Sequence, residues 1–355
     1  MRKVSVTHRE GSYPIIVGKG IRFELQKHLQ KSYSKILIVT DETVAKLYLH
    51  DVLESLTTCP TVEYVLPAGE KSKSIEVFYD MQTKAIEAGL DRNSLIIALG
   101  GGVVGDLAGF VAATFMRGID YIQVPTTILA HDSSVGGKVA INHPLGKNLI
   151  GAFHQPAGVY FDIDTLATLP EEEIRSGYAE LIKEGLISDE PLFRQMLESN
   201  LDSITVEELE RNILAGIDVK RIIVQADEKE HGIRSFLNLG HTLAHALEAD
   251  LGYGKITHGE AVAIGLLFSI HVSERVYNKE LPFKTLKDWL IANKYPLDSF
   301  SFDLEQLIRL MKSDKKAVNE RINMVLMKAV GSLQLEAMTD EALRNHLETF
   351  RERLV

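Results

Sequence analysis

The sequence predicts two parts of different class: an α/β amino-terminal domain with a mainly parallel sheet, and an all-α carboxyl-terminal domain. Short β-branched runs alternate with stretches of helical periodicity up to about residue 165, as in parallel sheets with crossover helices. After Leu166 no strong strand signal follows until a short run at 322–327. We therefore expect domains at 1–168 and 169–355.

The elements of the first domain follow in order. Two β-branched runs, 4–7 and 15–17, flank a turn-like segment containing Gly11 and Pro14, which predicts an opening hairpin, and a helix is expected near 21–30. Further strands are expected at 36–39, 62–66, 94–99, 121–124 and 159–163, and further helices at 73–89 and 103–116.

Helix-start signals mark the second domain. Pro170 precedes three glutamates, and a helix amino terminus favours a proline and negative charge. Thr257 and Glu260 form a T-x-x-E capping box in front of an apolar segment, 261–276. Both signals predict helices.

Composition limits the function classes. The net charge of −10 and 45% hydrophobic residues exclude a disordered chain and argue against a nucleic-acid binder. One cysteine, Cys59, can form neither an internal disulfide nor a Cys-rich zinc site, so a reducing, cytoplasmic compartment fits. We find neither an apolar leader nor a membrane span, and any metal must be held by histidines and carboxylates.

A glycine-rich segment follows the strand predicted at 94–99. Gly100-Gly-Gly-Val-Val-Gly-Asp106 satisfies G-x-G-x-x-G, in which backbone N–H groups and a helix amino terminus approach a pyrophosphate. The usual acidic residue some 20 positions further on is absent, and a tight turn with close helix packing remains the alternative. A Walker loop is excluded because Val139 follows Gly137-Lys138.

The second domain contains candidate metal ligands. Glu180 and Lys183 share one helix face, although a surface ion pair is the better explanation for an isolated pair of this spacing. Arg234, Asn238, His241 and His245 would form one polar stripe if their segment is a single helix. Each histidine alone is compatible with a satisfied core position. Together, a carboxylate, His241 and His258 could form a His-His-carboxylate metal site.

Polar and charged residues near predicted loops and helix ends indicate a polyanionic substrate, although solvated surface charge is the alternative for each. They are Arg117, Asp132, Lys138, Lys147, Asn148, Lys220, Glu230, Arg234 and the Lys315-Lys316 pair.

Taken together, these motifs closely resemble the 3-dehydroquinate synthase family of sugar phosphate cyclases, over almost the whole chain. The resemblance is carried by Gly100-Gly-Gly-Val-Val-Gly-Asp106, Gln123-Val-Pro-Thr-Thr127, Asp132-Ser-Ser-Val-Gly-Gly-Lys138, Pro144-Leu-Gly-Lys-Asn148, Asn238-Leu-Gly-His-Thr242 and His258-Gly-Glu260.

The resemblance implies a lyase of the shikimate pathway that converts the sugar acid phosphate DAHP (3-deoxy-D-arabino-heptulosonate 7-phosphate) to 3-dehydroquinate and phosphate. The cycle runs through oxidation by NAD, phosphate elimination, re-reduction, ring opening and an intramolecular aldol reaction. NAD and a divalent metal, zinc in the first place and cobalt as a possibility, are the implied cofactors. A cytoplasmic homodimer is the implied assembly, with no nucleic-acid or membrane partner.

The resemblance also implies residue roles. The metal ligands are Glu180, His241 and His258. The NAD-binding residues are Asp41, Glu70, Lys73, Gly101, Gly102, Asp106, Thr126, Thr127, Lys147 and Thr168. The substrate or catalytic residues are Asp132, Lys138, Asn148, Lys183, Lys220, Glu230, Arg234, Asn238, His245 and Lys315 or Lys316, with Arg117 reaching across from the partner subunit.

Three other classes remain open. A metal-dependent polyol or glycerol dehydrogenase would share the two-part plan, but its neutral substrates have no use for the cations. A sister sugar phosphate cyclase would keep nearly every motif. A nucleotide-sensing module would leave the metal ligands without a purpose.

Overall fold

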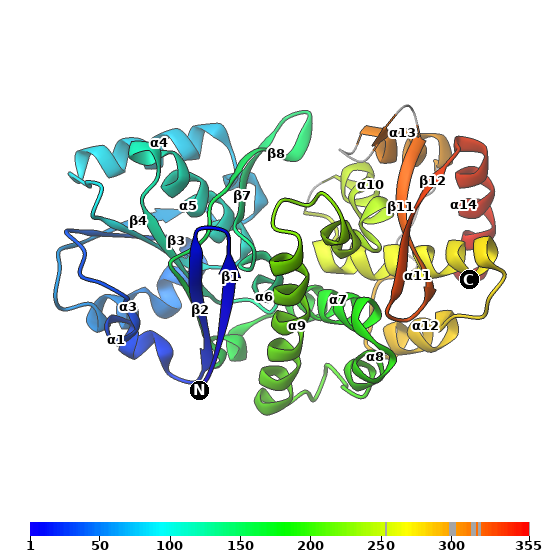
Figure 1. The fold of residues 1–355 in the computed structure, drawn as a ribbon, viewed down its shortest axis with the longest axis horizontal. Coiled ribbons are helices and arrows are strands. Elements are labelled where there is room, and N and C mark those ends of the chain that lie inside the picture. The colour runs from blue at the N-terminus through cyan, green and yellow to red at the C-terminus, as the bar shows by residue number, and fades with distance from the viewer. Residues whose placement is uncertain (253, 298–302, 314–316, 319–320, 355) are drawn as a thin grey trace. The chain divides into compact units, whose positions relative to one another are not determined.

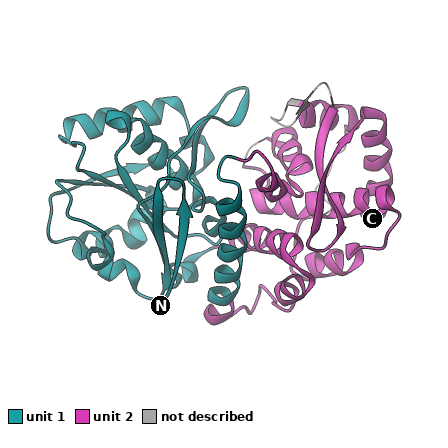
Figure 2. Cartoon of the chain, viewed as in Figure 1, with its two compact units in different colours: residues 1–169, 209–229 teal, residues 170–208, 230–355 magenta. Residues whose placement is uncertain are grey.

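The computed structural model describes residues 1–252, 254–297, 303–313, 317–318 and 321–354. The chain forms two compact units (Figure 2): unit 1 comprises Met1–Leu169 and Leu209–Lys229, and unit 2 comprises Pro170–Glu208 and Glu230–Val355. Among the described helices, none combines the length and the apolar character needed to cross a membrane.

Unit 1 is built around a seven-stranded sheet with the order β1-β2-β9-β6-β5-β3-β4 (Figure 1). The predicted opening hairpin is confirmed as the antiparallel pair β1–β2, and the other neighbours are parallel. The five further strands predicted from the sequence are confirmed, each with a small shift of its ends. The bounds are β1 Arg2–His8, β2 Gly11–Gly18, β3 Ile36–Asp41, β4 Thr61–Leu66, β5 Leu95–Gly100, β6 Asp120–Pro125 and β9 Gly158–Asp162.

Helices cover both faces of this sheet, with α4 and α5 on one side and α1 and α3 on the other (Figure 1). Successive strand residues point to opposite faces, so Leu37 packs with the α4 and α5 side and Ile38 with the other. Burial on both faces explains the continuous apolar runs of the strands. The helices are η1 Ile21–Glu24, α1 Leu25–His28, α2 Glu42–Val44, η2 Ala45–Leu49, α3 His50–Ser55, η3 Glu70–Ser72, α4 Ile75–Glu87, α5 Gly102–Thr114, η4 Phe115–Arg117, α6 Ala130–Ser133 and η5 Ile163–Thr168.

The order of the strands reverses beside β5. The chain runs outward from β3 to β4 and then crosses back to β5, on the other side of β3, before continuing to β6 and β9. In open α/β sheets, ligands bind beyond the carboxyl ends of the strands at such a reversal. The glycine-rich segment begins at this position, since Gly100 ends β5 and Gly102 begins α5.

A second, two-stranded sheet in unit 1 had no counterpart in the predicted elements. β7 (Lys138–His143) and β8 (Gly146–Phe153) form an antiparallel hairpin that packs on α5. The packing is close, because a Cβ atom at Gly109 would lie 2.4 Å from Cγ1 of Val139. The hairpin carries Lys138, Lys147 and Asn148.

Unit 2 is mainly helical, as predicted, but it also contains a small antiparallel sheet, β10-β11-β12. Its strand β11 covers the run at 322–327 noted in the sequence. The most deeply buried helices are α7 and α11, which pack against each other. The bounds are α7 Glu171–Ser188, α8 Glu190–Leu197, η6 Ile233–Asn238, α10 His241–Leu251, α11 His258–Tyr277, α12 Phe283–Ala292, α13 Leu304–Ser313, β10 Ala317–Val318, β11 Arg321–Ala329, β12 Ser332–Met338 and α14 Asp340–Leu354, and helix α9, Val206–Ala226, begins in unit 2 and continues in unit 1.

Candidate active site

Three side chains from three helices of unit 2 converge. Glu180 lies within α7, His241 is the first residue of α10, and His258 is the first residue of α11. The Nε2 atoms of both histidines are 3.4 Å from the same oxygen, Oε1 of Glu180. Candidate ligand atoms of the three residues all lie within 4.8 Å of one another. Two imidazoles and one carboxylate form a ligand set that catalytic zinc sites use, with one coordination position left for substrate.

His241 is held in the protonation state that a metal ligand needs. Its Nδ1 atom is 3.1 Å from the carbonyl oxygen of Leu239, which can only accept, so Nδ1 carries the proton and Nε2 carries the lone pair. Burial lowers the pKa of His241 to about 4. The ring is therefore neutral at pH 7, with its free lone pair on the side of Glu180.

Glu180 is an ionised carboxylate whose two oxygens face different partners. Burial by itself would raise its pKa, but the charge of Lys183 and the contacts with both histidines hold the pKa well below its usual range. Nζ of Lys183 is 2.5 Å from Oε2, whereas Oε1 faces the histidines. The surface-pair alternative is wrong, because both side chains are only 2% exposed. One oxygen is thus available to a metal while Lys183 neutralises the other.

The first turn of α11 is fixed against α7, and this positions His258. The backbone N–H of Gly259 donates to Oγ of Ser176 at 3.0 Å. A Cβ atom at Gly259 would lie 1.7 Å from the carbonyl oxygen of Ser176, so only glycine permits this approach. The predicted capping box of Thr257 and Glu260 is confirmed.

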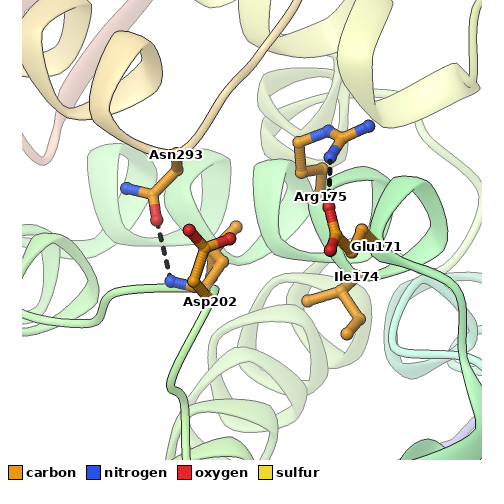
Figure 3. A pocket seen from close by; sticks show the side chains of 6 residues that line it. Glu171, Ile174, Arg175, Asp202 and Asn293 are labelled. Carbon is orange, nitrogen blue, oxygen red and sulfur yellow. Dashed lines mark hydrogen bonds and ion pairs between the residues drawn. The ribbon is translucent and has the colours of Figure 1, made fainter.

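Arg175 of α7 makes a second link between α7 and α11. Its Nε donates to Oε1 of Glu260 at 3.0 Å, and its guanidinium also faces Glu171 (Figure 3). Arg175 and Glu171, together with Asp202 and Asn293, line a cavity of about 10 Å³ (Figure 3), which is the space of a single water molecule. This cavity is too small for a substrate, and of its lining residues Arg175 is the one that contacts Glu260 at the start of α11.

The segment from Arg234 to His245 is not a single helix, so the conditional polar stripe does not form. η6 ends at Asn238, and α10 begins only at His241 after Gly240, which adopts a left-handed conformation (φ 82°). Nδ2 of Asn238 donates to Glu230 at 2.9 Å, and Arg234 is 1% exposed. The ring of His245 lies 5.4 Å from that of His241 and 5.9 Å from that of His258. His245 and Lys183 therefore adjoin the three candidate ligands.

In unit 1, the glycines of the glycine-rich segment differ in what surrounds them. A Cβ atom at Gly105 would lie 2.5 Å from Oε1 of Gln123, so this glycine is needed for packing. Cβ atoms at Gly101 and Gly102 would instead approach the side chains of Thr127 and Ser133, at 3.0 and 3.2 Å. These two glycines open the amino terminus of α5 beside hydroxyl groups that follow β6, an arrangement suited to an anionic ligand.

Lys73 joins several of the predicted residues in unit 1. It is 3% exposed, and its Nζ donates to Asp106 at 2.7 Å and to Asn148 at 2.6 Å. Burial raises the pKa of Asp106 although Lys73 lies against it. Glu70 lies 3.9 Å from Lys147. The structure thus brings together residues that are up to 78 positions apart, from Glu70 to Asn148.

Asn142 was missed in the sequence. Its Nδ2 donates to Glu70 at 2.8 Å, and its Oδ1 accepts from the backbone N–H of Asn148 at 2.9 Å. Asn148 has a positive φ of 55°, so this hydrogen bond helps to hold a strained residue. The only available signal was that Asn142 lies beside the Pro144–Asn148 motif.

The remaining predicted residues differ in their exposure and in their partners. Nζ of Lys220 is 2.8 Å from Oδ2 of Asp132, whereas Lys138 and Arg117 are exposed. Asp41 caps α2 and Thr168 contacts Tyr48, so both already have structural partners. The side chain of Thr126 is buried with no hydrogen-bond partner at Oγ1. Lys315 and Lys316 lie outside the described residues.

The chain matches two protein-family descriptions, one for each half. Residues 63–176 match the family described as "3-dehydroquinate synthase N-terminal", and residues 177–317 match "3-dehydroquinate synthase C-terminal". The chain is 56% identical over its full length to the 3-dehydroquinate synthase of Oceanobacillus iheyensis, covering 99% of that protein. It is 48% identical to the enzyme of the same name from Bacillus mycoides, with both chains fully covered.

Solved structures with the same fold include a sister cyclase. A 2-deoxy-scyllo-inosose synthase complexed with carbaglucose-6-phosphate, NAD⁺ and Co²⁺ has a TM-score of 0.90 at 25% identity, covering 99% of this chain and 100% of that one. Glycerol dehydrogenase from Schizosaccharomyces pombe has a TM-score of 0.69 at 15% identity, covering 96% and 89%, and this likeness concerns the fold alone. On the full-length matches, the chain belongs to the 3-dehydroquinate synthase family.

Proposed function

We propose that the chain converts DAHP to 3-dehydroquinate and inorganic phosphate, as a carbon–oxygen lyase of the shikimate pathway. The observation that carries the proposal is the full-length match to 3-dehydroquinate synthases, at 56% and 48% identity, together with the convergence of Glu180, His241 and His258. Two buried cations lie in the same unit, since Lys183 and Arg234 are each 1% exposed, and Lys183 is paired with Glu180. An anionic sugar acid phosphate would accept charge-assisted hydrogen bonds from such cations, whereas a neutral polyol offers them no negative charge.

The metal ligands in this proposal are Glu180, His241 and His258. The chemistry of these ligands fits a divalent cation, because His241 is neutral and Glu180 is ionised. In addition, each of the three residues offers a ligand atom, and these atoms lie within 4.8 Å of one another. Two histidines and a carboxylate favour zinc, and cobalt accepts the same ligands. A metal bound here would make a coordinated substrate hydroxyl more acidic, and NAD would accept hydride and return it within one turnover.

The NAD site in this proposal lies at the carboxyl ends of the strands of unit 1. Gly101 and Gly102 admit a pyrophosphate to the amino terminus of α5, and the unpartnered hydroxyl of Thr126 gives it a donor. Further contacts are assigned to Asp41, Glu70, Lys73, Asp106, Thr127, Lys147 and Thr168. We assign NAD binding to residues 1–168, and metal binding together with most substrate contacts to residues 169–355.

The chain's own side chains bind and orient the substrate. Lys183, next to the metal ligands, would attract its negative charge, and His245, whose ring adjoins those of His241 and His258, would accept or donate a proton at the substrate. Cations that hold the phosphate stabilise it as it leaves. The cations assigned to this role are Lys138, Lys220, Arg234 and one of Lys315 and Lys316, and Asp132, Asn148, Glu230 and Asn238 are assigned to binding and orienting the substrate.

We assign a homodimeric, cytoplasmic state to the protein. Arg117 is exposed, and it follows Met116, an exposed apolar residue; both have positive φ values, 71° and 49°. A strained, exposed turn of this kind is suited to a contact with another chain, and Arg117 is the residue assigned to the partner's substrate. The single cysteine, Cys59, is a free thiol, which suits a reducing compartment.

The test is a redox balance. Purified enzyme is given zinc, DAHP in excess, and NAD equal to enzyme, while phosphate and absorbance at 340 nm are recorded. We expect many equivalents of phosphate per NAD and no net accumulation of NADH, because the hydride is returned. Lys138→Ala should slow phosphate release and leave metal binding unchanged. NADH rising in proportion to substrate consumed, with a neutral polyol preferred, would instead identify a dehydrogenase.

A further inference from the structure

The imidazole of His258 has a partner on the side away from Glu180. Its Nδ1 atom is 3.1 Å from Oε2 of Glu248, a residue of α10. Glu248 is 4% exposed, so its carboxylate is withdrawn from solvent. It is not one of the three assigned metal ligands, and neither the motifs nor the proposed reaction assign a role to it.

The direction of this hydrogen bond decides which nitrogen of His258 can bind a metal. An ionised carboxylate only accepts, so Nδ1 of His258 donates to Glu248 and the lone pair remains on Nε2. Nε2 is the atom that lies 3.4 Å from Oε1 of Glu180. In the opposite tautomer, Nε2 would carry a hydrogen and could not coordinate a cation.

The two histidine ligands obtain the same tautomer in different ways. For His241 the acceptor is a backbone carbonyl, that of Leu239, which no side-chain substitution removes. For His258 the acceptor is the side chain of Glu248, which mutation can remove. His258 also begins α11, where the positive end of the helix dipole disfavours additional charge on the ring.

A second metal position is the competing explanation. His245, Glu248 and His258 also have candidate ligand atoms within 4.8 Å of one another. Occupying that position and the first one at once would require His258 to bind a cation through each nitrogen and so to lose its remaining proton. A proton shared between Nδ1 and Glu248 satisfies both groups without this step.

We propose that Glu248 is a positioning residue that fixes His258 in the Nδ1-protonated tautomer and thereby sets the metal affinity of the site. This inference rests on the metal centre of the proposed function and extends it to a residue that does not touch the metal. A buried carboxylate in this position also makes the imidazole a stronger ligand, because it stabilises positive charge on the ring.

Three variants separate orientation from charge. In Glu248→Gln, the amide oxygen still accepts from Nδ1 but the negative charge is lost, whereas Glu248→Ala removes both. Asp250→Asn is the matched control, because Asp250 lies two residues further along α10 and is only partly buried. We expect Glu248→Ala to weaken metal binding about 10- to 100-fold. Glu248→Gln should fall between Glu248→Ala and the parent, and Asp250→Asn should match the parent.

The measurement is a titration of metal-free enzyme with Co²⁺ alone, in competition with a chelator and followed by visible absorption. Glu248→Ala should also alter the cobalt spectrum, because a misoriented or wrongly protonated ring changes the ligand field. An unchanged spectrum and a Co²⁺ affinity within about threefold of the parent would overturn the proposal, since an outer-shell partner normally contributes more than this.

A second measurement decides the case even if Glu248→Ala fails to fold. Nitrogen-15 NMR of the zinc-loaded parent enzyme should show a proton on Nδ1 of His258 and none on Nε2, and a proton on Nε2 with Nδ1 bare would refute the assignment. Neither experiment uses DAHP. A protein that binds Co²⁺ as expected but does not release phosphate would therefore contradict the proposed function and leave the role of Glu248 standing.

Discussion

Gly265 of α11 lies directly against the backbone of Gly240. A Cβ atom at Gly265 would be 1.9 Å from the carbonyl oxygen of Gly240, a distance that no side chain can occupy. Gly240 in turn has a positive φ of 82° and immediately precedes His241. The contact therefore fixes the distance between the helix that begins with His258 and the turn that presents His241.

Gly265→Ala is accordingly expected to damage the metal centre from a position that touches none of its ligands. The added methyl group must push α11 away from Gly240, at a cost of about 1–3 kcal/mol in the free energy of unfolding. Urea unfolding measures this loss, and Co²⁺ titration should show weakened binding. NAD binding is the internal control, because α11 belongs to unit 2. Unchanged stability and unchanged Co²⁺ affinity would mean that the contact is easily relieved.

The types of the metal-site residues were visible in the sequence, but the way in which they are brought together was not. The residues themselves indicated His241, His258 and a carboxylate, and the family resemblance implied that the carboxylate is Glu180. Nothing in the sequence showed that Gly259 and Gly265 allow α11 to touch α7 and Gly240, because the effect of a missing Cβ depends on a neighbour distant in the chain. The contact of Glu248 with His258 could not be predicted from the sequence for the same reason.

The three candidate ligands should act as one unit. Glu180→Ala, His241→Ala and His258→Ala are each expected to abolish tight metal binding and turnover, because removing one ligand leaves an under-coordinated cation and unpaired buried groups. Dialysis followed by metal analysis measures occupancy. His50→Ala is the control, because the side chain of His50 is 82% exposed. Full occupancy in all three variants would contradict the ligand assignment.

Substitutions of Gly102 and Gly105 should have different effects, the first on NAD binding and the second on stability. Gly102→Val is expected to keep its fold and metal but to lose NAD. Its Cβ atom would lie 3.2 Å from Oγ of Ser133 and 3.7 Å from Cδ2 of Leu129, whereas the bulk of the valine blocks close approach by a pyrophosphate. Gly105→Ala is the matched variant, and it should lower stability through its clash with Gln123. Calorimetric titration with NAD, together with thermal unfolding, separates the two effects. If Gly102→Val binds NAD with the affinity of the parent enzyme, the role of Gly102 is structural and not in NAD binding.

Sequence periodicity predicted the central strands well, because burial on both faces leaves long apolar runs such as Leu95–Gly100. It failed where local signals were weak or mixed. The hairpin of β7 and β8 is rich in polar and glycine residues, and its pairing depends on packing against α5. The spacing from Arg234 to His245 looked helical, but Gly240 introduces a left-handed turn that the spacing could not reveal.

A pH dependence of stability follows from His271, which lies far along α11 from the metal ligands. Its ring accepts from Arg353 through Nδ1 and contacts Thr349 through Nε2, which suits a neutral imidazole. Burial, with Arg353, Arg275 and His346 nearby, lowers the pKa of His271 to about 4. The corresponding value in the unfolded chain is about 6.5.

The sign of the effect is fixed by these two values. Between pH 6.5 and 4 the unfolded chain takes up a proton at this position and the folded protein does not, so the free energy of unfolding falls as the pH falls. Above pH 6.5 this contribution is constant. The slope from one such group is at most about 1.4 kcal/mol per pH unit.

His271→Gln is therefore expected to flatten the decline in stability between pH 6.5 and 4, whatever its effect at pH 7. Urea unfolding of the parent enzyme and the variant at pH 7, 6 and 5 measures the two slopes. The enzyme should be saturated with zinc, so that titration of the metal ligands does not contribute. His50→Gln, at an exposed position, should keep the parental slope. If His271→Gln also keeps it, the acid sensitivity comes from other buried groups, and His346, whose pKa burial also lowers, is the next residue to replace.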